Sequence, residues 1–220
     1  MSPTGSGTTS TDAEFPLRRA RMVDRQLRRR GIRDQRVLAA MASVARERFV
    51  PPETADRAYR DGALAIGHGQ TISQPWIVAR MTELLALEGP ERVLEVGTGS
   101  GYGAAVLSRV CAHVVSVERL PALSGEAARA LEAEGVRNVE LRIGDGSAGV
   151  PDRAPFDAIC VTASAAGTEP PAALVEQLAP GAPLVCPLDR DGEEHLAVMR
   201  HGVLESVAPV RFVPLVEGGA

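Results

Sequence analysis

The sequence predicts an α/β fold: a doubly wound, mostly parallel sheet, preceded by helices and finished by an antiparallel hairpin. Three observations lead to this prediction. Short apolar runs alternate with helical patterns along the second half of the chain, which is typical of parallel sheets. The first of these runs, residues 93–96, leads directly into a glycine-rich turn and a helix. Near the end, only a turn at Gly202 separates two strand patterns, as in a hairpin.

Length and composition indicate one domain. The chain has 220 residues, of which 45% are hydrophobic, so it can bury a sizeable core. We expect residues 1–12, which are rich in Ser, Thr and Gly, to form a disordered tail. The single domain then covers 13–220, with a helical N-terminal cap and a loop over 13–90 and a ligand-binding sheet over 91–220.

Charge and cysteine content exclude several classes of protein. A net charge of −4 argues against broad affinity for nucleic acid. No apolar run approaches the roughly 18 residues of a membrane span, and the N-terminus lacks the charged start and apolar stretch of a signal peptide, so we expect no membrane partner and a cytoplasmic location. The three cysteines show no metal-ligand spacing, and Cys160 and Cys186 lie in strand-like runs, which predicts buried free thiols and no metal site.

The N-terminal cap is predicted to consist of helices. Apolar positions at helical spacing predict a helix over 20–30, ended by Gly31. A second helix covers 35–43, and Asp34 is placed to cap its first turn. After a loop, a third helix covers 76–87.

In the second half, strands and helices alternate. The predicted strands cover residues 93–96, 114–118, 139–143, 156–162 and 183–188, the helices between them cover 104–107, 127–134 and 172–178, and the hairpin strands cover 195–200 and 204–215.

The glycine turn after the first of these strands is the strongest local signal. Gly97, Gly99 and Gly101 alternate, and glycine allows positive φ and a close approach of the backbone to a ligand. In α/β sheets such strand–turn–helix connections bind nucleotide-like ligands. Tyr102 stands where the dinucleotide fingerprint requires its third glycine, and the chain contains no lysine for a phosphate-binding P-loop.

Acidic residues accompany each of the first three strands of this half. Glu95 lies within the first strand, Glu118 ends the second, and Asp145 follows the third. Glu118 has the spacing at which an acid reaches a ribose diol. Acids at three strand ends form a polar rim for a nucleoside without phosphate, which indicates an S-adenosylmethionine site. We expect Glu118 to bind the ribose hydroxyls and Asp145 to approach the adenine amine, whereas Glu95 should form hydrogen bonds rather than react.

Several motifs along the chain occur together in one known family. They are Gly67-His68-Gly69-Gln70-Thr71-Ile72-Ser73-Gln74-Pro75 and residues 93–102, 116–119, 144–146, 154–157, 161–163 and 212–215. With these motifs the chain resembles, from residue 21 to residue 215, the protein-L-isoaspartate O-methyltransferase family. The glycine motif occurs in methyltransferases broadly, but the Thr-Ile-Ser-Gln-Pro loop together with Val-Thr-Ala is more specific. The resemblance implies a Rossmann-like methyltransferase fold with S-adenosyl-L-methionine as cofactor. It also implies methylation of the α-carboxylate of L-isoaspartyl residues in damaged peptides and proteins, which leads through a succinimide to repair.

The resemblance also implies the site residues, with Ser73 as the catalytic-site serine. The expected cofactor-binding residues are Thr71, Ile72, Ser73, Glu95, Gly97, Thr98, Gly99, Ser100, Gly101, Glu118, Asp145 and Gly146. The expected substrate-binding residues are Gln70, Ser73, Gln74, Val161, Thr162 and Ala163. We expect the protein to act as a monomer on isoaspartyl-containing peptides and proteins.

Several alternatives stay open at this point. Ala65, Gly103 and Ser164 depart from the family's common residues and leave the preferred peptide undecided. Relatives of the family instead methylate an ordinary aspartate in one dedicated peptide to form an aspartimide. A methyltransferase for a small molecule or RNA, and a nucleoside-binding module without turnover, are the other candidates. Ser73 could also serve only as a cap of the following helix, while His68, between two glycines, is expected at an exposed loop tip rather than as a base.

Overall fold

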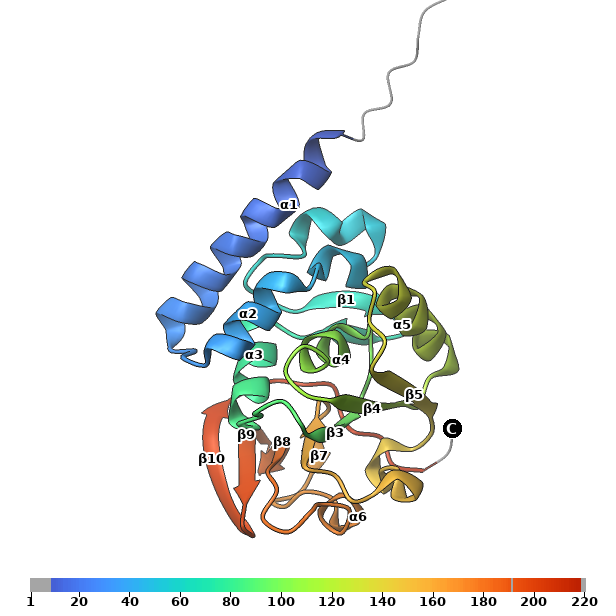
Figure 1. Ribbon diagram of the computed structural model, residues 1–220. Coiled ribbons are helices and arrows are strands. Elements are labelled where there is room, and N and C mark those ends of the chain that lie inside the picture. The colour runs from blue at the N-terminus through green and yellow to red at the C-terminus, as the bar shows by residue number, and fades with distance from the viewer. Residues whose placement is uncertain (1–8, 191, 219–220) are drawn as a thin grey trace, which may run out of the picture.

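The computed structural model describes residues 9–190 and 192–218 of the chain (Figure 1). Its helices are α1 (Thr9–Met22), α2 (Gln35–Ser43), α3 (Pro75–Leu84), α4 (Tyr102–Leu107), α5 (Pro121–Ala133) and α6 (Ala172–Val175), with short helical turns η1 (Val23–Leu27), η2 (Arg28–Arg30), η3 (Arg46–Phe49), η4 (Pro52–Arg57), η5 (Gly146–Ala148) and η6 (Pro151–Arg153). Its strands are β1 (Leu64–Gly67), β2 (Gln70–Ile72), β3 (Arg92–Val96), β4 (His113–Glu118), β5 (Val139–Ile143), β6 (Ala158–Val161), β7 (Ala165–Ala166), β8 (Leu184–Arg190), β9 (Glu193–Arg200) and β10 (Val203–Pro209).

The first helix is longer than its apolar pattern indicated. The predicted helix over 20–30 is the end of a helical segment that begins at Thr9 and runs through α1, η1 and η2. The tail expected over 1–12 is therefore wrong for residues 9–12, where Ser, Thr and Asp are favoured at a helix start. Residues 1–8 lie outside the described residues. The predicted end at Gly31 is confirmed, with a left-handed φ of 96°.

The next helix forms as predicted. The Asp34 side chain accepts hydrogen bonds from the backbone nitrogens of Arg36 and Val37, at 2.7 and 3.3 Å, and so caps α2. Val37, Leu38 and Met41 are buried on one face of the helix.

The expected loop before α3 contains a two-stranded hairpin instead. β1 and β2 pair antiparallel, and His68 and Gly69 form the turn between them. Both residues have positive φ, 53° and 71°, as the tight turn of a two-residue hairpin requires. The loop prediction missed this because the strands are only four and three residues long. This hairpin presents Gln70 and Thr71 to the candidate site.

Two helices end earlier than their patterns predicted. α3 ends at Leu84 rather than at residue 87, and α6 ends at Val175 rather than at 178. In both cases the final turn has the tighter 3₁₀ hydrogen bond, in which a backbone nitrogen donates to the carbonyl three residues earlier. The Leu85 nitrogen donates to the Thr82 carbonyl, and the Gln177 nitrogen donates to the Leu174 carbonyl. α5 begins earlier than predicted, at Pro121, because proline is favoured in the first turn of a helix.

The central sheet confirms the predicted fold class. The strand order is β10-β9-β8-β6-β3-β4-β5, with β7 paired to β8. β3 pairs parallel with β4 on one side and with β6 on the other, so the strand order reverses beside β3. In open α/β sheets this switch point is where ligands bind, at the carboxyl ends of the strands.

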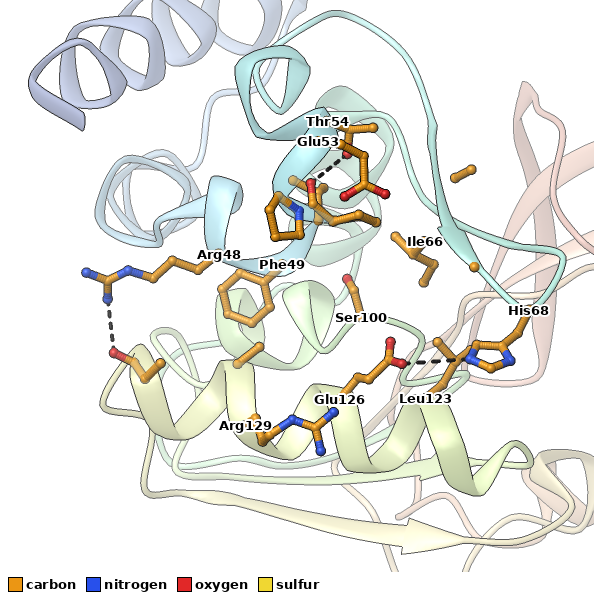
Figure 2. Close-up of a pocket in the computed structure, with 17 residues that line it drawn as sticks. Arg48, Phe49, Glu53, Thr54, Ile66, His68, Ser100, Leu123, Glu126 and Arg129 are labelled. Atoms are coloured by element: carbon orange, nitrogen blue, oxygen red, sulfur yellow. Dashed lines mark hydrogen bonds and ion pairs between the residues drawn. The ribbon is translucent and has the colours of Figure 1, made fainter. Parts of the chain in front are cut away.

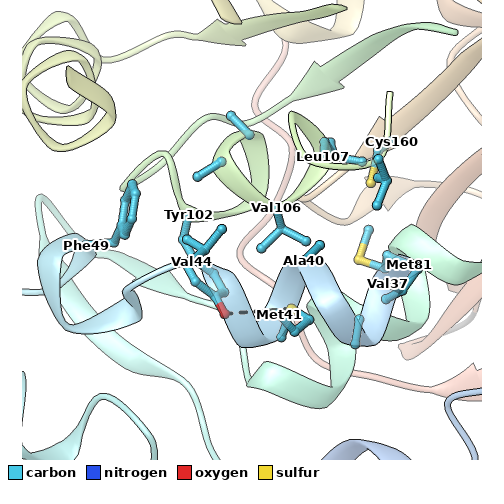
Figure 3. Packing of buried hydrophobic residues seen from close by; sticks show 14 of the residues in the cluster. Val37, Ala40, Met41, Val44, Phe49, Met81, Tyr102, Val106, Leu107 and Cys160 are labelled. Carbon is cyan, nitrogen blue, oxygen red and sulfur yellow. Dashed lines mark hydrogen bonds between the residues drawn. The ribbon is translucent and has the colours of Figure 1, made fainter. Parts of the chain in front are cut away.

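Helices cover both faces of the sheet. In Figure 1, α2, α3, α4 and α5 lie on one side of the sheet and α6 lies on the other. Successive residues of β3 point into different cores: Val93 packs with the larger cluster beneath the N-terminal helices, whereas Leu94 and Val96 pack with the cluster on the α6 side. Figure 3 shows part of the larger cluster.

The C-terminal hairpin is confirmed, but its second strand is shorter than predicted. β10 ends at Pro209, not at residue 215, because proline cannot donate to a strand ladder. The chain then returns toward the parallel strands: the Ser164 nitrogen donates to the Val213 carbonyl at 2.8 Å, and the Leu215 nitrogen donates to the Ser164 carbonyl at 2.7 Å. These bonds place residues 213–216 beside the carboxyl end of β6.

Cys111, Cys160 and Cys186 are all free and buried, which confirms the thiol prediction. Burial raises the pKa of the Cys186 thiol to about 12. None of the helices that the structure describes has the length and apolar character of a membrane-spanning segment.

Candidate active site

A cleft opens at the carboxyl ends of the parallel strands, between the β1–β2 hairpin and the C-terminal segment. Its lining residues are Gln70, Thr71, Gly97, Gly99, Glu118, Arg119, Leu120, Gly146, Thr162, Ala163, Val213, Pro214, Leu215 and Val216. They come from the ends of β3, β4 and β6, from the turn after β5, and from two segments that close over this edge of the sheet. The cleft therefore lies at the switch point of the sheet.

The glycine turn has the backbone conformation that only glycine adopts freely. Gly97, Gly99 and Gly101 have φ of 94°, 53° and 86°. A Cβ atom at Gly97 would overlap the Thr162 hydroxyl, and one at Gly146 would lie 2.5 Å from Val96 Cγ1. Gly97 and Gly146 therefore allow the turns after β3 and β5 to pack closely against Thr162 and Val96.

Glu118 is held in a fixed orientation at the end of β4. One carboxylate oxygen accepts a hydrogen bond from the Gly99 nitrogen at 2.9 Å, and the other accepts from the Leu120 nitrogen at 3.0 Å. The residue is only 7% exposed, yet it lines the cleft. A carboxylate oxygen has two lone pairs, so both oxygens keep acceptor capacity for ligand hydroxyls.

Thr162 connects β6 to the glycine turn. Its hydroxyl donates to the Gly97 carbonyl at 2.7 Å and lies 3.0 Å from the Val96 carbonyl, which accepts a hydrogen bond from the Thr162 backbone nitrogen at 2.8 Å. Thr162 therefore fixes the first residue of the turn, while Ala163 lines the cleft beside it.

Asp145, in contrast, does not line the cleft. One of its oxygens accepts from the nitrogen and the hydroxyl of Ser147, at 2.9 and 2.7 Å, and the other accepts from the Gly218 nitrogen at 2.7 Å. The hydrogen bond from the Ser147 side chain is the main reason why the pKa of Asp145 lies below its usual value. The structure thus places Asp145 under the C-terminal segment, with its neighbour Gly146 facing the cleft.

Glu95 is buried behind the glycine turn. It is 1% exposed and accepts a hydrogen bond from the Ser116 hydroxyl at 2.6 Å, and Ser116 in turn shares a 2.6 Å hydrogen bond with Thr98. Burial raises the pKa of Glu95 to about 8. Gly103 makes room for this carboxyl group, because a Cβ atom there would overlap Glu95 Oε1.

Ser73 and Gln74 follow β2 and lead into α3. The Ser73 carbonyl accepts a hydrogen bond from Arg46 Nη2 at 2.7 Å, and Gln74 Nε2 donates to Asp61 Oδ1 at 2.6 Å. Gln74 occupies the N-cap position of α3 and makes no side-chain capping hydrogen bond, and the hydrogen bond that the structure gives for Ser73 involves its carbonyl rather than its hydroxyl. Both residues are half-buried.

The other expected site residues lie around the cleft rather than on its surface. Ile72, Thr98 and Val161 are buried, and Gly101 forms the left-handed N-cap of α4. Ser100 lines a second, larger cleft on the far side of the β1–β2 hairpin. Of the expected residues, the structure brings Gln70, Thr71, Gly97, Gly99, Glu118, Gly146, Thr162 and Ala163 together in the cleft.

Sequence reasoning missed the contribution of the C-terminal segment. Residues 213–216 line the cleft, although the sequence pattern placed 212–215 in a hairpin strand. Pro209 and Pro214 are the signal that could have found this, because two prolines five residues apart do not fit one paired strand. Arg119 and Leu120 were missed as well; they directly follow Glu118.

The larger cleft is shown in Figure 2. It has a volume of about 770 Å³ and lies between η3, η4, the hairpin and α5. His68 is at its rim, and its Nε2 is 3.7 Å from Glu126 Oε1 of α5. The His68 side chain is 43% exposed, which confirms the expected loop tip. Among the described residues, no group of His, Cys, Asp and Glu side chains could hold a metal ion.

The chain is similar to one protein family over most of its length. The sequence profile of the family "Protein-L-isoaspartate(D-aspartate) O-methyltransferase" matches residues 18–220. A protein-L-isoaspartate O-methyltransferase of Methylorubrum populi is 55% identical over 205 residues, which cover 91% of this chain and 95% of that protein. A relative in Rhodopseudomonas palustris, protein-L-isoaspartate O-methyltransferase 1, is 50% identical over 214 residues, which cover 94% and 86%.

Solved structures show the same similarity. A protein-L-isoaspartate O-methyltransferase superposes with a TM-score of 0.79 at 30% identity, over 91% of this chain and 66% of that longer chain. A Plasmodium falciparum structure named for the same family, in complex with S-adenosyl-L-homocysteine, superposes with a TM-score of 0.77 at 25% identity, over 91% and 99%.

Proposed function

The chain belongs to the protein-L-isoaspartate(D-aspartate) O-methyltransferase family, and on this premise we propose how it acts. It transfers a methyl group from S-adenosyl-L-methionine to the α-carboxylate of L-isoaspartyl residues in damaged peptides and proteins. The resulting ester closes to a succinimide, which leads to repair. The main structural support is the oriented Glu118 carboxylate, which lies beside the open glycine turn in the cleft.

The residues of the cleft fit the cofactor. Glu118 would accept hydrogen bonds from the ribose hydroxyls, since both of its oxygens are oriented by backbone nitrogens. Gly97, Gly99 and Gly146 line the cleft without side chains of their own, so their backbone can lie close to the ligand. When bound, S-adenosyl-L-methionine supplies an electrophilic methyl group on a sulfonium. The glycine turn itself, residues 97–101, contains no lysine or arginine, which suits a nucleoside without phosphate.

The substrate carboxylate needs no general base. Its reference pKa is about 4, so it is already ionised at neutral pH and can act directly as the nucleophile. We assign its orientation to the Ser73 hydroxyl, which is not used to cap α3. A neutral hydroxyl orients the oxygen without holding its charge, and this matters because the charge fades as the methyl is transferred.

Alignment and exclusion of water provide the remaining catalysis. Correct placement of two reactants contributes up to about 7–11 kcal/mol to lowering the barrier. The β1–β2 hairpin and residues 213–216 border the cleft from two sides, which limits access of water. Glu95 takes no part as a base, because burial raises its pKa to about 8, which keeps it largely neutral at pH 7, and because it does not line the cleft.

Location, oligomeric state and partners complete the proposal. The protein acts in the cytoplasm, where thiols stay reduced; its free, buried cysteines support this. It acts as a monomer on polypeptides and not on nucleic acids or membranes. In support, the exposed large hydrophobic residues that the structure describes are few: Leu17 in α1, Ile143 in β5, Val203 in β10 and Val216 in the C-terminal segment.

A panel of peptides tests repair against the tailoring of one dedicated peptide. The panel holds unrelated short isoaspartyl peptides, each with a matched aspartyl control. We expect methylation of the isoaspartyl member of most pairs. Methylation confined to an ordinary aspartate of one folded or cyclised peptide would contradict the repair function and favour tailoring.

A further inference from the structure

Arg46 is a fully buried arginine that contacts the segment carrying Ser73. It has 0% exposure and lies at the start of η3. Its Nη2 donates to the Ser73 carbonyl and its Nε donates to the Ala58 carbonyl, both at 2.7 Å. The guanidinium therefore ties the segment after β2 to the end of η4 and fixes the backbone of the residue whose hydroxyl we assign to the substrate.

The same guanidinium also contacts the glycine turn's helix. Its central carbon lies 4.7 Å from the centroid of the Tyr102 ring, a cation–π arrangement. Tyr102 follows Gly101 as the first residue of α4 and is itself buried, and Figure 3 shows its ring among the residues of the larger core. Arg46 thus lies between the Ser73 segment and the helix that begins at the cofactor cleft.

The charge of Arg46 has no acidic partner. No carboxylate of the described residues forms an ion pair with it, and its buried Nη1 has no hydrogen-bond partner there. Burial, the largest cause, lowers the pKa of Arg46 from its usual value. A buried charge without a counter-ion is costly, and apolar side chains of similar volume are often tolerated better in such places. Stability alone therefore does not account for an arginine at this position.

We propose that Arg46 is a positioning residue for methyl transfer: it fixes the Ser73 segment through the Ser73 carbonyl, and its uncompensated charge favours a carboxylate at that segment. This inference rests on the proposed function. A cation near a low-dielectric site attracts an anion over a longer range than in water. The guanidinium is bound to the carbonyls of Ser73 and Ala58. Its positive charge can therefore favour binding of the substrate without contacting the reacting oxygen.

The position of the charge determines which kinetic constant it affects. The carboxylate carries its full charge in the bound substrate and less of it in the transition state, so a nearby cation stabilises the bound substrate more. Loss of the charge alone should therefore raise KM for isoaspartyl peptides without lowering kcat. Loss of the hydrogen bond to Ser73 should loosen the segment and lower kcat as well.

Three variants separate these contributions. Arg46→Met removes the charge and both hydrogen bonds, and we expect KM to rise about tenfold or more, as for loss of a charge-assisted interaction. Arg46→Lys keeps the charge and should restore most of the KM while kcat stays reduced. Arg48→Met is the matched control, because Arg48 lies on the same η3 turn but binds Glu134 at 3.0 Å and is 52% exposed; its kinetics should equal those of the unaltered protein.

A double variant tests whether Arg46 acts through Ser73. If it does, the combined effect of Arg46→Met and Ser73→Ala on kcat/KM is smaller than the product of the two single effects, as expected for coupled residues. Binding of S-adenosyl-L-homocysteine, measured by calorimetry, should change less than about twofold in all variants that fold, since Arg46 touches no residue lining the cofactor cleft.

Amide hydrogen exchange supplies a readout that needs no substrate. Exchange across residues 72–74 should become about tenfold faster in Arg46→Met and stay unchanged in Arg48→Met. Unchanged exchange there, or equal kinetic constants with only a lowered melting temperature, would overturn the inference and leave Arg46 as a purely structural residue. If the unaltered protein methylates no isoaspartyl peptide while exchange still responds to Arg46→Met, the proposed function fails and the positioning of the segment stands.

Discussion

The Thr162 hydroxyl occupies the position that a Gly97 side chain would need, and it donates a 2.7 Å hydrogen bond to the Gly97 carbonyl. Two residues 65 positions apart in the chain thus shape one wall of the candidate cleft. Gly97→Ala should weaken binding of S-adenosyl-L-homocysteine by about tenfold or more, because both the overlap and the positive φ of 94° disfavour a side chain. Calorimetry measures this.

A second variant separates the effect of the overlap with Thr162 from the effect of the positive φ at Gly97. Adding Thr162→Ala to Gly97→Ala removes the overlap but not the backbone strain, so affinity should recover only in part. If Gly97→Ala binds S-adenosyl-L-homocysteine as tightly as the unaltered protein does, the glycine turn is not closely packed against the residue that follows β6 in solution.

Glu118 should carry a measurable share of the cofactor affinity. Loss of a charge-assisted hydrogen bond costs roughly 1.5–3 kcal/mol, so Glu118→Ala should bind S-adenosylmethionine about 10- to 150-fold more weakly. Glu126→Ala, on the neighbouring helix α5, should leave the affinity unchanged, since Glu126 faces the larger cleft. Equal affinity of Glu118→Ala and the unaltered protein in calorimetric titrations would exclude the ribose role.

Ser73→Ala should lower turnover while the cofactor still binds. The hydroxyl does not cap α3, so its loss should leave the melting temperature nearly unchanged. We expect kcat to fall by about tenfold, the effect of losing one positioning hydrogen bond in the transition state. Steady-state kinetics with an isoaspartyl peptide provide the measurement; unchanged kinetics together with a lower melting temperature would assign Ser73 a structural role instead.

Glu95 predicts a pH dependence of stability. Its pKa is raised from 4.5 to about 8 in the folded protein, so between these values the folded state binds the proton and the unfolded state does not. The free energy of unfolding should therefore decrease as the pH rises through this window, by up to about 1.4 kcal/mol per pH unit from this group, and level off above it.

Glu95→Gln isolates that contribution. Glutamine keeps an acceptor for the Ser116 hydroxyl and cannot ionise, so the contribution of residue 95 to the slope should disappear. Urea unfolding at several pH values between about 5 and 8 provides the comparison. Identical slopes in both proteins would mean that Glu95 titrates near its ordinary pKa.

The sequence was sufficient for the parts of the fold that depend on local patterns. Alternating strands and helices predicted the parallel sheet, Asp34 predicted the start of α2, and Gly31 predicted the end of the first helix. These features follow from side-chain periodicity and capping chemistry, which act over a few residues. The glycine turn and Glu118 were likewise predicted together, because the strand order of such sheets places them at one edge.

What the sequence did not predict depends on contacts between distant segments. Residues 213–216 reach the cleft through hydrogen bonds to Ser164, and no local pattern encodes that pairing. Asp145 was expected at the adenine; its oxygens accept hydrogen bonds from Ser147 and Gly218 and the residue does not line the cleft, so this role stays a prediction. Arg46 was not singled out, since only the folded chain shows that its guanidinium meets Ser73, Ala58 and Tyr102.

The central claim is most directly tested with one pair of peptides. A synthetic peptide with a single L-isoaspartyl residue and its aspartyl twin, identical in every other residue, are incubated separately with the protein and S-adenosylmethionine carrying a labelled methyl group. Base-labile label should accumulate in the isoaspartyl peptide and not in the aspartyl twin. Equal labelling of the two peptides, or labelling of neither, would contradict the assignment of this cleft to the repair of isoaspartyl residues.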